Sequence, residues 1–494
     1  MAKTRRTTKT PPAPPPPAPS DWLSGWRPLA VLALAVVVFY WTPLTSPDAS
    51  IQWDAVDTHY SPQKYFAGRL WSGPLPFWTP YIFSGFPFLA DPQVGAWYPP
   101  NWPFFLAGVT PRAIQGELAL HGLLACLGTY LLALGHVDHR AGALLAALAY
   151  GLSGFFAGHS SHVGIFSAAA GLPWLLLALD RGWMALGGAI GGCLILAGHF
   201  QTALYAFAAL TLFAVARRKW TRVPAIAVLA ALIACIQVLP GLELTAHSIR
   251  AGADYSRSTD GVLPPAGLAT LVAPNFLGAL SGAYTGPPDI TQYYLYGGLL
   301  LLPLAALGLR NAQLRLTALL LIVPALWYAL GPAAGLYRLI ALLPGFRNVR
   351  APVHDWFVVS LGLALLAGAG AAFVLERWRK AYLGPLLILV LFADLLYWNS
   401  WNNSLAYARS SYEELYGNKE TGVASKVAAS QPALSRFHAP DRLSAFGPMN
   451  HPLDLKLEAT YGYNPLELAA YAAYRDAMSR NPKLLDALNV SRVL

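Results

Sequence analysis

The sequence predicts an all-α polytopic membrane protein with about eleven transmembrane helices, a large first external loop and a small mixed external C-terminal domain. Hydrophobic residues make up 55% of the 494, charged residues only 12%, and the mean hydropathy is +0.43. Soluble domains carry about 25% charged residues, so this composition belongs to another class. Apolar runs long enough to cross the roughly 30 Å of a bilayer's hydrocarbon core also recur along most of the chain.

The elements follow in order along the chain. Residues 1–25 are basic and then proline-rich, which predicts a cytoplasmic tail without fixed structure. Residues 26–399 form the expected transmembrane domain, and residues 400–494, where charged and polar residues return, form the expected external C-terminal domain. We expect spans near 26–44, 113–135, 140–157, 162–179, 184–199, 201–216, 222–239, 292–309, 315–332, 355–375 and 381–398. The stretch 263–278 is interrupted by proline and is expected to be re-entrant or interfacial.

Lysine and arginine residues predict the orientation. They cluster in short loops that fall on one side when the spans alternate, as at Lys3–Lys9, Arg217–Arg222 and Arg377–Lys380. Short loops rich in Lys and Arg are typical of the cytoplasmic side, so we expect the N-terminus inside and the C-terminus outside a cytoplasmic (inner) membrane. The same clustering accounts for the net charge of +10 without a nucleic-acid partner.

The long segments 45–112, 240–291 and 333–354 then share the external face. The first of them is rich in aromatic residues and proline, and we expect it to fold against the membrane surface. All loops with polar, chemically capable side chains therefore fall on one side of the membrane.

The first external loop supplies candidate catalytic acids. Asp54 and Asp57 lie three residues apart directly after the first span, and a short helical continuation points both to one side. One carboxylate then acts as general base on an acceptor hydroxyl, while the other tunes its pKa or binds a divalent cation. The alternative is a solvated pair at the membrane boundary. Asp54 is preferred as the base because it is closer to the span and follows Trp53. Asp91 and Gln93 are candidate substrate-binding residues of the same loop.

A pair of arginines precedes a late span on the external face. Arg347 and Arg350 lie in GFRNVRAPVHDW, and guanidinium groups fork onto phosphate oxygens. Arginines on this face run against the usual distribution of positive charge. The pair is therefore a candidate phosphate site, with anchoring to lipid headgroups as the alternative.

Polar residues interrupt the apolar segments at two further places. His199 and Gln201 lie in AGHFQTALY and His159 in GHSSHVGIF, and such breaks line a cavity or close a turn. His159 and His162 lack a third ligand at zinc spacing, so no metal site is predicted from them. The sequence contains no Walker loop, GxSxG elbow or HExxH motif, which gives no support to ATP-driven or metalloprotease chemistry.

The succession of these segments, followed by FADLLYWN and ATYGYNPLELAAYAAY, resembles the bacterial YfhO-type membrane proteins, which are similar to the GT-C superfamily of polytopic glycosyltransferases. The resemblance implies transfer of a sugar from a polyprenyl-phosphate donor to a cell-envelope glycan or glycolipid acceptor at the outer membrane face. It places the essential acid of the first loop on Asp54 or Asp57 and the arginine stretch on Arg347 and Arg350. A divalent cation is the one cofactor to be considered.

Two other functions stay open. A transporter or flippase of lipid-linked glycans requires polar residues at mid-membrane and repeated halves, and the sequence has no evident internal repeat. A non-catalytic membrane assembly protein would use the aromatic loop only as a docking surface. The acids and arginines on one face favour the glycosyltransferase.

Overall fold

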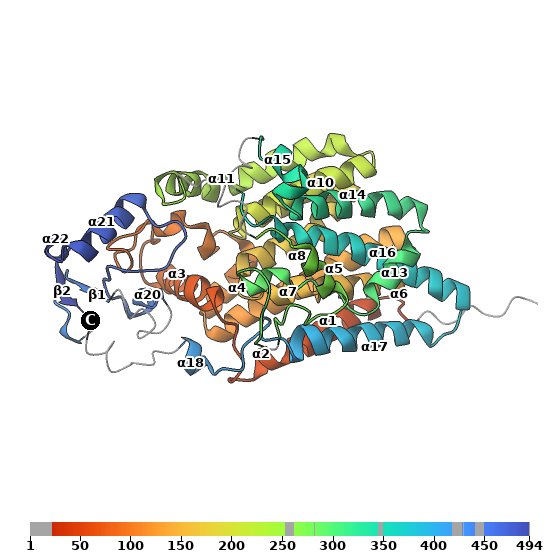
Figure 1. Ribbon diagram of the computed structural model, residues 1–494, viewed down its shortest axis with the longest axis horizontal. Coiled ribbons are helices and arrows are strands. Elements are labelled where there is room, and N and C mark those ends of the chain that lie inside the picture. The colour runs from red at the N-terminus through yellow and green to blue at the C-terminus, as the bar shows by residue number, and fades with distance from the viewer. Residues whose placement is uncertain are drawn as a thin grey trace, which may run out of the picture.

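The chain forms an elongated bundle of helices with loops and a C-terminal segment gathered at one end (Figure 1). The computed structural model describes residues 22–251, 261–280, 282–343, 349–416, 427, 429–439 and 449–493. We call the end with the first long loop and the C-terminal segment the loop end, and the opposite end, which carries Arg140, Arg217 and Arg379, the basic end. The predicted all-α membrane class is confirmed.

Within the described residues, seven helical segments are long and apolar enough to cross a membrane. They contain α5 (Pro111–Val137), α6 (Arg140–Gly151) with α7 (Gly154–Gly158), α8 (Val163–Arg181), α11 (Val223–His247), α14 (Ala312–Ala329), α16 (Trp356–Trp378) and α17 (Leu383–Leu396). Shorter apolar helices are α1 (Arg27–Phe39), α9 (Met184–Leu196) and α10 (Phe200–Ala216). The protein is therefore a multi-pass membrane protein.

One expected span is much shorter than the sequence indicates. Within 292–309 the structure has only the eight-residue helix α13 (Leu301–Gly308). Eight residues extend about 12 Å, far less than the bilayer core. The backbone leaves helical geometry at Gly298, where φ is +100°, and the preceding η7 (Ile290–Tyr293) is a 3-10 helix. The prediction of a full span here is wrong.

A different physical reason applies to the proline-interrupted stretch 263–278. It contains the 3-10 helix η6 (Pro265–Leu271) and no longer helix. Proline lacks the N–H that a continuing α-helix needs, so this stretch does not form a span.

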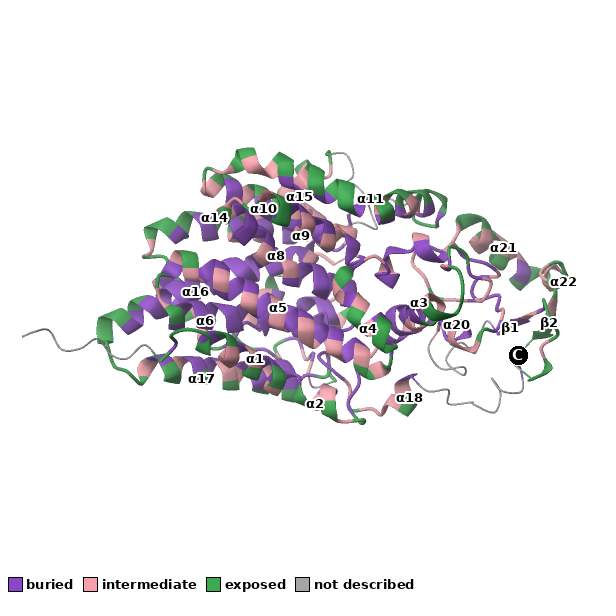
Figure 2. Cartoon of the chain, turned by 180° about the vertical axis from the view of Figure 1, so that it is seen from behind, coloured by how far each residue is buried: buried purple, intermediate pink, exposed green. Residues whose placement is uncertain are grey.

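The interior of the bundle is built on close helix contacts. Helix α16 packs tightly on α13, where a Cβ at Gly370 would lie 1.9 Å from the carbonyl oxygen of Leu304. Small residues at such contacts let membrane helices approach. Figure 2 shows buried residues concentrated in α5, α6, α8 and α16. Helix α11 instead exposes apolar side chains such as Leu232 (63%) and Leu239 (66%), as a lipid-facing helix requires.

The first loop is a folded structure. After α2 (Trp41–Thr45) it contains the π-helix η1 (Ala55–Tyr60), then the elements α3 (Ser61–Ser72), η2 (Phe88–Ala90), η3 (Pro92–Val94), η4 (Pro99–Asn101) and α4 (Trp102–Ala107). Its aromatic residues Phe83, Phe86 and Phe88 are buried. These loop residues therefore belong to the same hydrophobic core as the transmembrane helices.

The C-terminal segment packs on this loop. It comprises α18 (Tyr412–Tyr416), β1 (Arg436–His438), α20 (Pro452–Leu455), α21 (Ala469–Arg480), α22 (Leu484–Ala487) and β2 (Val490–Val493), with β1 and β2 parallel. The Ala459 N–H donates to the Tyr81 carbonyl at 3.2 Å, and the Phe83 N–H donates to the Tyr461 carbonyl at 3.1 Å. Backbone hydrogen bonds thus tie together two segments almost four hundred residues apart.

Candidate active site

A cavity of about 750 Å³ lies at the loop end, and we call it the loop-end cavity. It is formed by four separate parts of the chain: the start of the first loop, the turn between α7 and α8, the segment leading into η7, and the C-terminal segment. Its polar lining residues include Asp54, Ser161, His162, Asp289, Thr291 and Tyr463. Of the two predicted catalytic acids, Asp54 is the one that lines this cavity.

Asp54 stands at the start of η1, directly after Trp53, whose φ is +59°. The carboxyl Oδ2 of Asp54 lies 3.8 Å from Nε2 of His162. Burial raises the pKa of Asp54 above its ordinary value, His162 lowers it, and nearby Asp289 raises it further. A carboxylate with a raised pKa accepts a proton more readily than an ordinary aspartate.

Asp289 faces the same cavity in a different environment. Its carboxylate accepts hydrogen bonds from the Thr291 N–H at 3.2 Å, from the Thr291 hydroxyl, and from the Gln292 amide at 2.5 Å. Burial works against its charge, but His162 and these donors outweigh that effect and hold the pKa of Asp289 below its usual value. The cavity thus contains two acids with opposed tendencies, an arrangement typical of acid–base sites. Sequence reasoning missed Asp289, whose only signal was an acid in an external segment.

Asp57 has a different set of partners from Asp54. Its carboxyl Oδ1 accepts the Met449 N–H at 2.9 Å, and the Asn450 side-chain amide donates to its backbone carbonyl at 2.8 Å. The sequence predicted a short α-helical continuation with both carboxyls on one side. The chain instead forms a π-helix, a rarer and wider turn, and Asp57 contacts the C-terminal segment.

Asp91 also holds the loop to the C-terminal segment, whereas Gln93 contacts other residues of the first loop. Asp91 is buried at the start of η3, where it accepts the Gln93 N–H at 3.0 Å and the Asn464 amide at 2.6 Å. Burial raises the pKa of Asp91 to about 6. The Gln93 carbonyl lies 3.1 Å from Nδ1 of His59. Neither residue lines the loop-end cavity, and their predicted role in substrate binding stays a prediction.

Four histidines form a row that leads inward from the cavity. The ring centroids of His162 and His159 are 5.6 Å apart, those of His159 and His354 5.4 Å, and those of His354 and His199 5.7 Å. Burial, with the neighbouring histidines, lowers the pKa of both His159 and His199 to about 3. Neutral rings can pass or share protons without storing charge in a low-dielectric site. Among the described residues, no three His, Cys, Asp or Glu side chains are grouped to hold a metal ion.

Gln201 positions the backbone of Arg350. The Arg350 N–H donates to Gln201 Oε1 at 3.0 Å, and the Gln201 amide donates to the Arg350 carbonyl. Arg347 lies outside the described residues. Gln201 therefore contacts the predicted phosphate-binding segment through its backbone, a relation that sequence spacing does not reveal.

Arg250, just beyond α11, is a second cation that the sequence analysis missed. Burial and the charge of Arg350 both lower the pKa of Arg250, while Tyr463 opposes that shift. Tyr463 in turn lies close enough to Asp54 and Asp57 for their charges to raise its own pKa, after the larger effect of burial. Two arginines near one another repel, and an anion between them relieves that repulsion. Tyr463, whose charge acts on Arg250, also lines the cavity of Asp54.

Comparisons with known proteins rest on the fold alone. No family model matches the chain, and no curated protein matches its sequence. The structure of ArnT from Cupriavidus metallidurans bound to undecaprenyl phosphate is similar over 95% of this chain and 90% of that chain, with a TM-score of 0.53 and 11% identity. The arabinofuranosyltransferase AftD from Mycobacteria is similar over 89% of this chain and 33% of that chain, with a TM-score of 0.51 and 17% identity. The resemblance to YfhO-type proteins and to the GT-C superfamily stays a prediction, whereas the similarity of the fold to these two solved structures is shown.

Proposed function

We propose that the protein is a glycosyltransferase that transfers a sugar from a polyprenyl-phosphate donor to a cell-envelope glycan or glycolipid at the outer face of the cytoplasmic membrane. The observation that carries the proposal is the place of Asp54. A carboxylate with a raised pKa lines an open cavity at the loop end of a GT-C-like bundle. In this proposal the loop end faces outward, because the Lys and Arg clusters lie at the basic end.

The donor's phosphate is bound by Arg350 and Arg250. The charge of Arg350 contributes to the lowered pKa of Arg250, and an anion bound by both guanidinium groups would relieve that repulsion. Gln201 holds the Arg350 backbone in place. The predicted contribution of Arg347 is retained as part of the same site. The polyprenyl chain would lie along the apolar surface of the bundle, as exposed residues of α11 permit.

The chemistry needs one base. The acceptor hydroxyl gives its proton to the Asp54 carboxylate, its oxygen attacks the anomeric carbon, and the bond from that carbon to the phosphate oxygen breaks. The polyprenyl phosphate leaves as an anion and needs little protonation. General-base catalysis of this kind contributes about 10²–10⁴-fold. His162, 3.8 Å from the Asp54 carboxyl, favours its ionised form before the reaction.

A divalent cation is a candidate cofactor, and the fit of the described residues is incomplete. Asp54 and Asp289 are suitable oxygen donors, but no third ligand is grouped with them among the described residues. Transfer measured after chelation and after re-addition of Mg²⁺ or Mn²⁺ decides whether a metal is required.

The proposal is tested with three strains that carry the wild type, Asp54→Asn or Asp48→Asn in place of the chromosomal gene, beside a deletion strain. Asp48 is an exposed acid of the same loop and serves as the matched control. Mass spectrometry of the envelope glycans should show the same missing sugar in the deletion and Asp54→Asn strains only. A glycan change in the deletion strain that Asp54→Asn fully complements would favour a transporter or assembly protein instead.

A further inference from the structure

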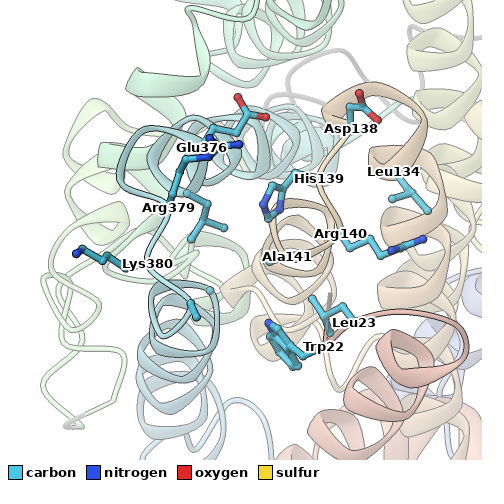
Figure 3. A pocket seen from close by; sticks show the side chains of 13 residues that line it. Trp22, Leu23, Leu134, Asp138, His139, Arg140, Ala141, Glu376, Arg379 and Lys380 are labelled. Carbon is cyan, nitrogen blue, oxygen red and sulfur yellow. The ribbon is translucent and has the colours of Figure 1, made fainter. Parts of the chain in front are cut away.

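Helix α17 has different surroundings at its two ends. At the basic end it borders a cavity of about 680 Å³, and Figure 3 shows the charged side chains there pointing apart, with Arg140 and Lys380 directed to opposite sides. Those charges do not converge on one point. Toward the loop end, by contrast, the FADLLYWN stretch, residues 392–399, directs two polar side chains to one segment of the chain, residues 294–299.

This stretch spans the end of α17 and the start of η11 (Tyr397–Trp401), the π-helix that follows α17 directly. The proposed transfer reaction does not use any residue of it. The segment that it contacts, however, follows η7, and Asp289 is the residue directly before η7. The stretch is therefore connected through a short length of chain to an acid of the loop-end cavity.

Asp394 binds the C-terminal part of the segment. The Tyr296 hydroxyl donates to its carboxylate and lies 2.9 Å from both oxygens, and the Leu299 N–H donates to Oδ2 at 2.7 Å. Leu299 lies directly after Gly298, whose φ of +100° marks the turn into α13. A carboxylate is a stronger hydrogen-bond acceptor than a neutral group. Asp394 therefore fixes the place where the segment turns into the helix.

Asn399 binds the middle of the segment and is fully buried. Its side-chain amide donates to the Leu152 carbonyl, just beyond α6, at 2.8 Å and to the Tyr296 carbonyl at 3.3 Å. Its side-chain oxygen accepts the Tyr294 hydroxyl at 3.0 Å. One asparagine thus joins η11, the end of α6 and the segment in surroundings where an unpaired polar group is costly.

Helix α7 contacts the same part of the chain without a spacing side chain. The Gly154 N–H donates to the Tyr296 carbonyl at 2.6 Å. A Cβ at Gly154 would lie 2.7 Å from the Tyr296 nitrogen, and one at Gly158 would lie 2.5 Å from the Thr291 carbonyl oxygen. The turn that follows α7 carries His162. These contacts fix the segment and η7 relative to that histidine.

We propose that Asp394 and Asn399 are positioning residues that hold Asp289 in the loop-end cavity, beside Asp54 and His162. They act through residues 294–299, which continue directly from η7. The effect on catalysis rests on the proposed transfer reaction, whereas the contact itself is a property of the folded chain.

The position of Asp289 bears on the proposed base. Burial has the largest effect on the pKa of Asp54 and raises it, His162 lowers it, and Asp289 raises it. Asp57 and Tyr463 also interact with the charge of Asp54. If Asp289 moves away, the pKa of Asp54 falls and its carboxylate stays ionised at lower pH. Displacing Asp289 should therefore move the acidic limb of kcat/KM to lower pH, opposite to the shift expected from loss of His162.

Hydrogen–deuterium exchange of the full-length protein tests the contact without a measurement of transfer. The Thr291 N–H donates to the Asp289 carboxylate at 3.2 Å, so its exchange rate reports on that carboxylate. Asn399→Leu removes the hydrogen bonds of the side chain and adds no charge. It should make exchange at Thr291 about tenfold faster or more. Tyr397→Phe, which changes a half-exposed ring of the same stretch, is the matched control and should leave the rate unchanged.

A milder variant covers the case in which Asn399→Leu does not fold. Tyr296→Phe removes only the hydroxyl that donates to Asp394 and keeps the ring. It should make exchange at Thr291 about threefold faster or more while the melting temperature is nearly retained. Unchanged exchange in either variant, when that variant is folded, overturns the proposal.

The transfer assay tests the effect on Asp54. Asn399→Leu and Asp289→Asn should each move the acidic limb of kcat/KM to lower pH, and the combined variant should move it no further than Asp289→Asn alone. Additive shifts, or a limb that stays in place although exchange at Thr291 is faster, overturn the positioning role. Absence of transfer by the wild type would instead contradict the proposed function, and the exchange rates would still decide whether the stretch holds Asp289.

Discussion

His162 and Asp54 come together across the loop-end cavity, with 3.8 Å between the histidine Nε2 and the aspartate Oδ2. The two residues belong to different parts of the chain, the turn before α8 and the start of η1. His162 lowers the pKa of Asp54 against the larger opposing effect of burial. This pairing makes the protonation of the proposed base sensitive to a residue over a hundred positions away.

The pH profile of the reaction should depend on that pair. The base must be ionised to act, so kcat/KM should rise with pH through the raised pKa of Asp54. His162→Gln removes a group that favours the ionised form, and the acidic limb should therefore move to higher pH. Ser160→Ala, in the same turn but not lining the cavity, is the control. A profile that does not move in His162→Gln would contradict Asp54 as the titrating base.

Asp57 should matter for stability more than for chemistry. Asp57→Ala removes the acceptor of the Met449 N–H, a partly buried hydrogen bond. Loss of such a bond costs about 1–3 kcal/mol when the donor stays unsatisfied. We expect a lower melting temperature and faster proteolysis of the C-terminal segment, with residual transfer in the fraction that is folded. A fully stable Asp57→Ala protein without transfer would instead indicate that the Asp57 carboxylate is the catalytic base.

The arginine pair should control use of the donor. Charge-assisted hydrogen bonds contribute about 1.5–3 kcal/mol each, so Arg350→Ala and Arg250→Ala should each weaken undecaprenyl-phosphate binding by about tenfold or more. Lysine at either position should restore only part of the binding affinity, because lysine keeps the positive charge but cannot form the two parallel hydrogen bonds of a guanidinium group. Arg338→Ala, an exposed arginine of the same end, is the matched control. Unchanged binding in the double alanine variant would leave the pair as a headgroup anchor.

Asp91 should make the free energy of unfolding depend on pH in the acidic range. Its pKa is raised from 3.8 to about 6 in the folded protein by burial, so the folded state holds a proton that the unfolded state has released. Stability from this group is present below pH 3.8 and is lost as pH rises through about 6. Asp91→Asn should remove that part of the slope. Melting temperatures measured from pH 4 to 7 test this, and an unchanged slope would show that Asp91 is ionised when folded.

Topology is tested with reporter fusions after Lys219, at the basic end, and after Lys483, in the C-terminal segment. The Lys219 fusion should report from the cytoplasm and the Lys483 fusion from outside, since Lys and Arg clusters mark the cytoplasmic loops. The same signal from both positions would contradict the proposed orientation and, with it, an outward-facing transfer site.

Properties that depend on composition and local pattern were predictable. Apolar length and low charge predicted the helical membrane class, and proline predicted that 263–278 does not form a continuous helix. The sequence also indicated that the first loop carries candidate functional residues, because acids beside aromatic residues directly follow an apolar run. The failure at 292–309 has a local cause, since hydropathy counts apolar residues and does not register the positive φ adopted at Gly298.

The composition of the loop-end cavity was decided only by the tertiary structure. From the sequence, Asp54 and Asp57 were similar candidates for the catalytic carboxylate. The tertiary structure distinguishes them, because Asp57 accepts and is held by hydrogen bonds from Met449 and Asn450. Asp54 instead lines the cavity together with His162 and Asp289. Likewise, the sequence shows Gln201 only as a polar residue between two apolar segments. In the structure its side chain hydrogen-bonds to the backbone of Arg350. Helical period and hydropathy reflect interactions over a few neighbouring residues. The partners that set a side chain's pKa lie up to several hundred residues away and are brought together by packing alone.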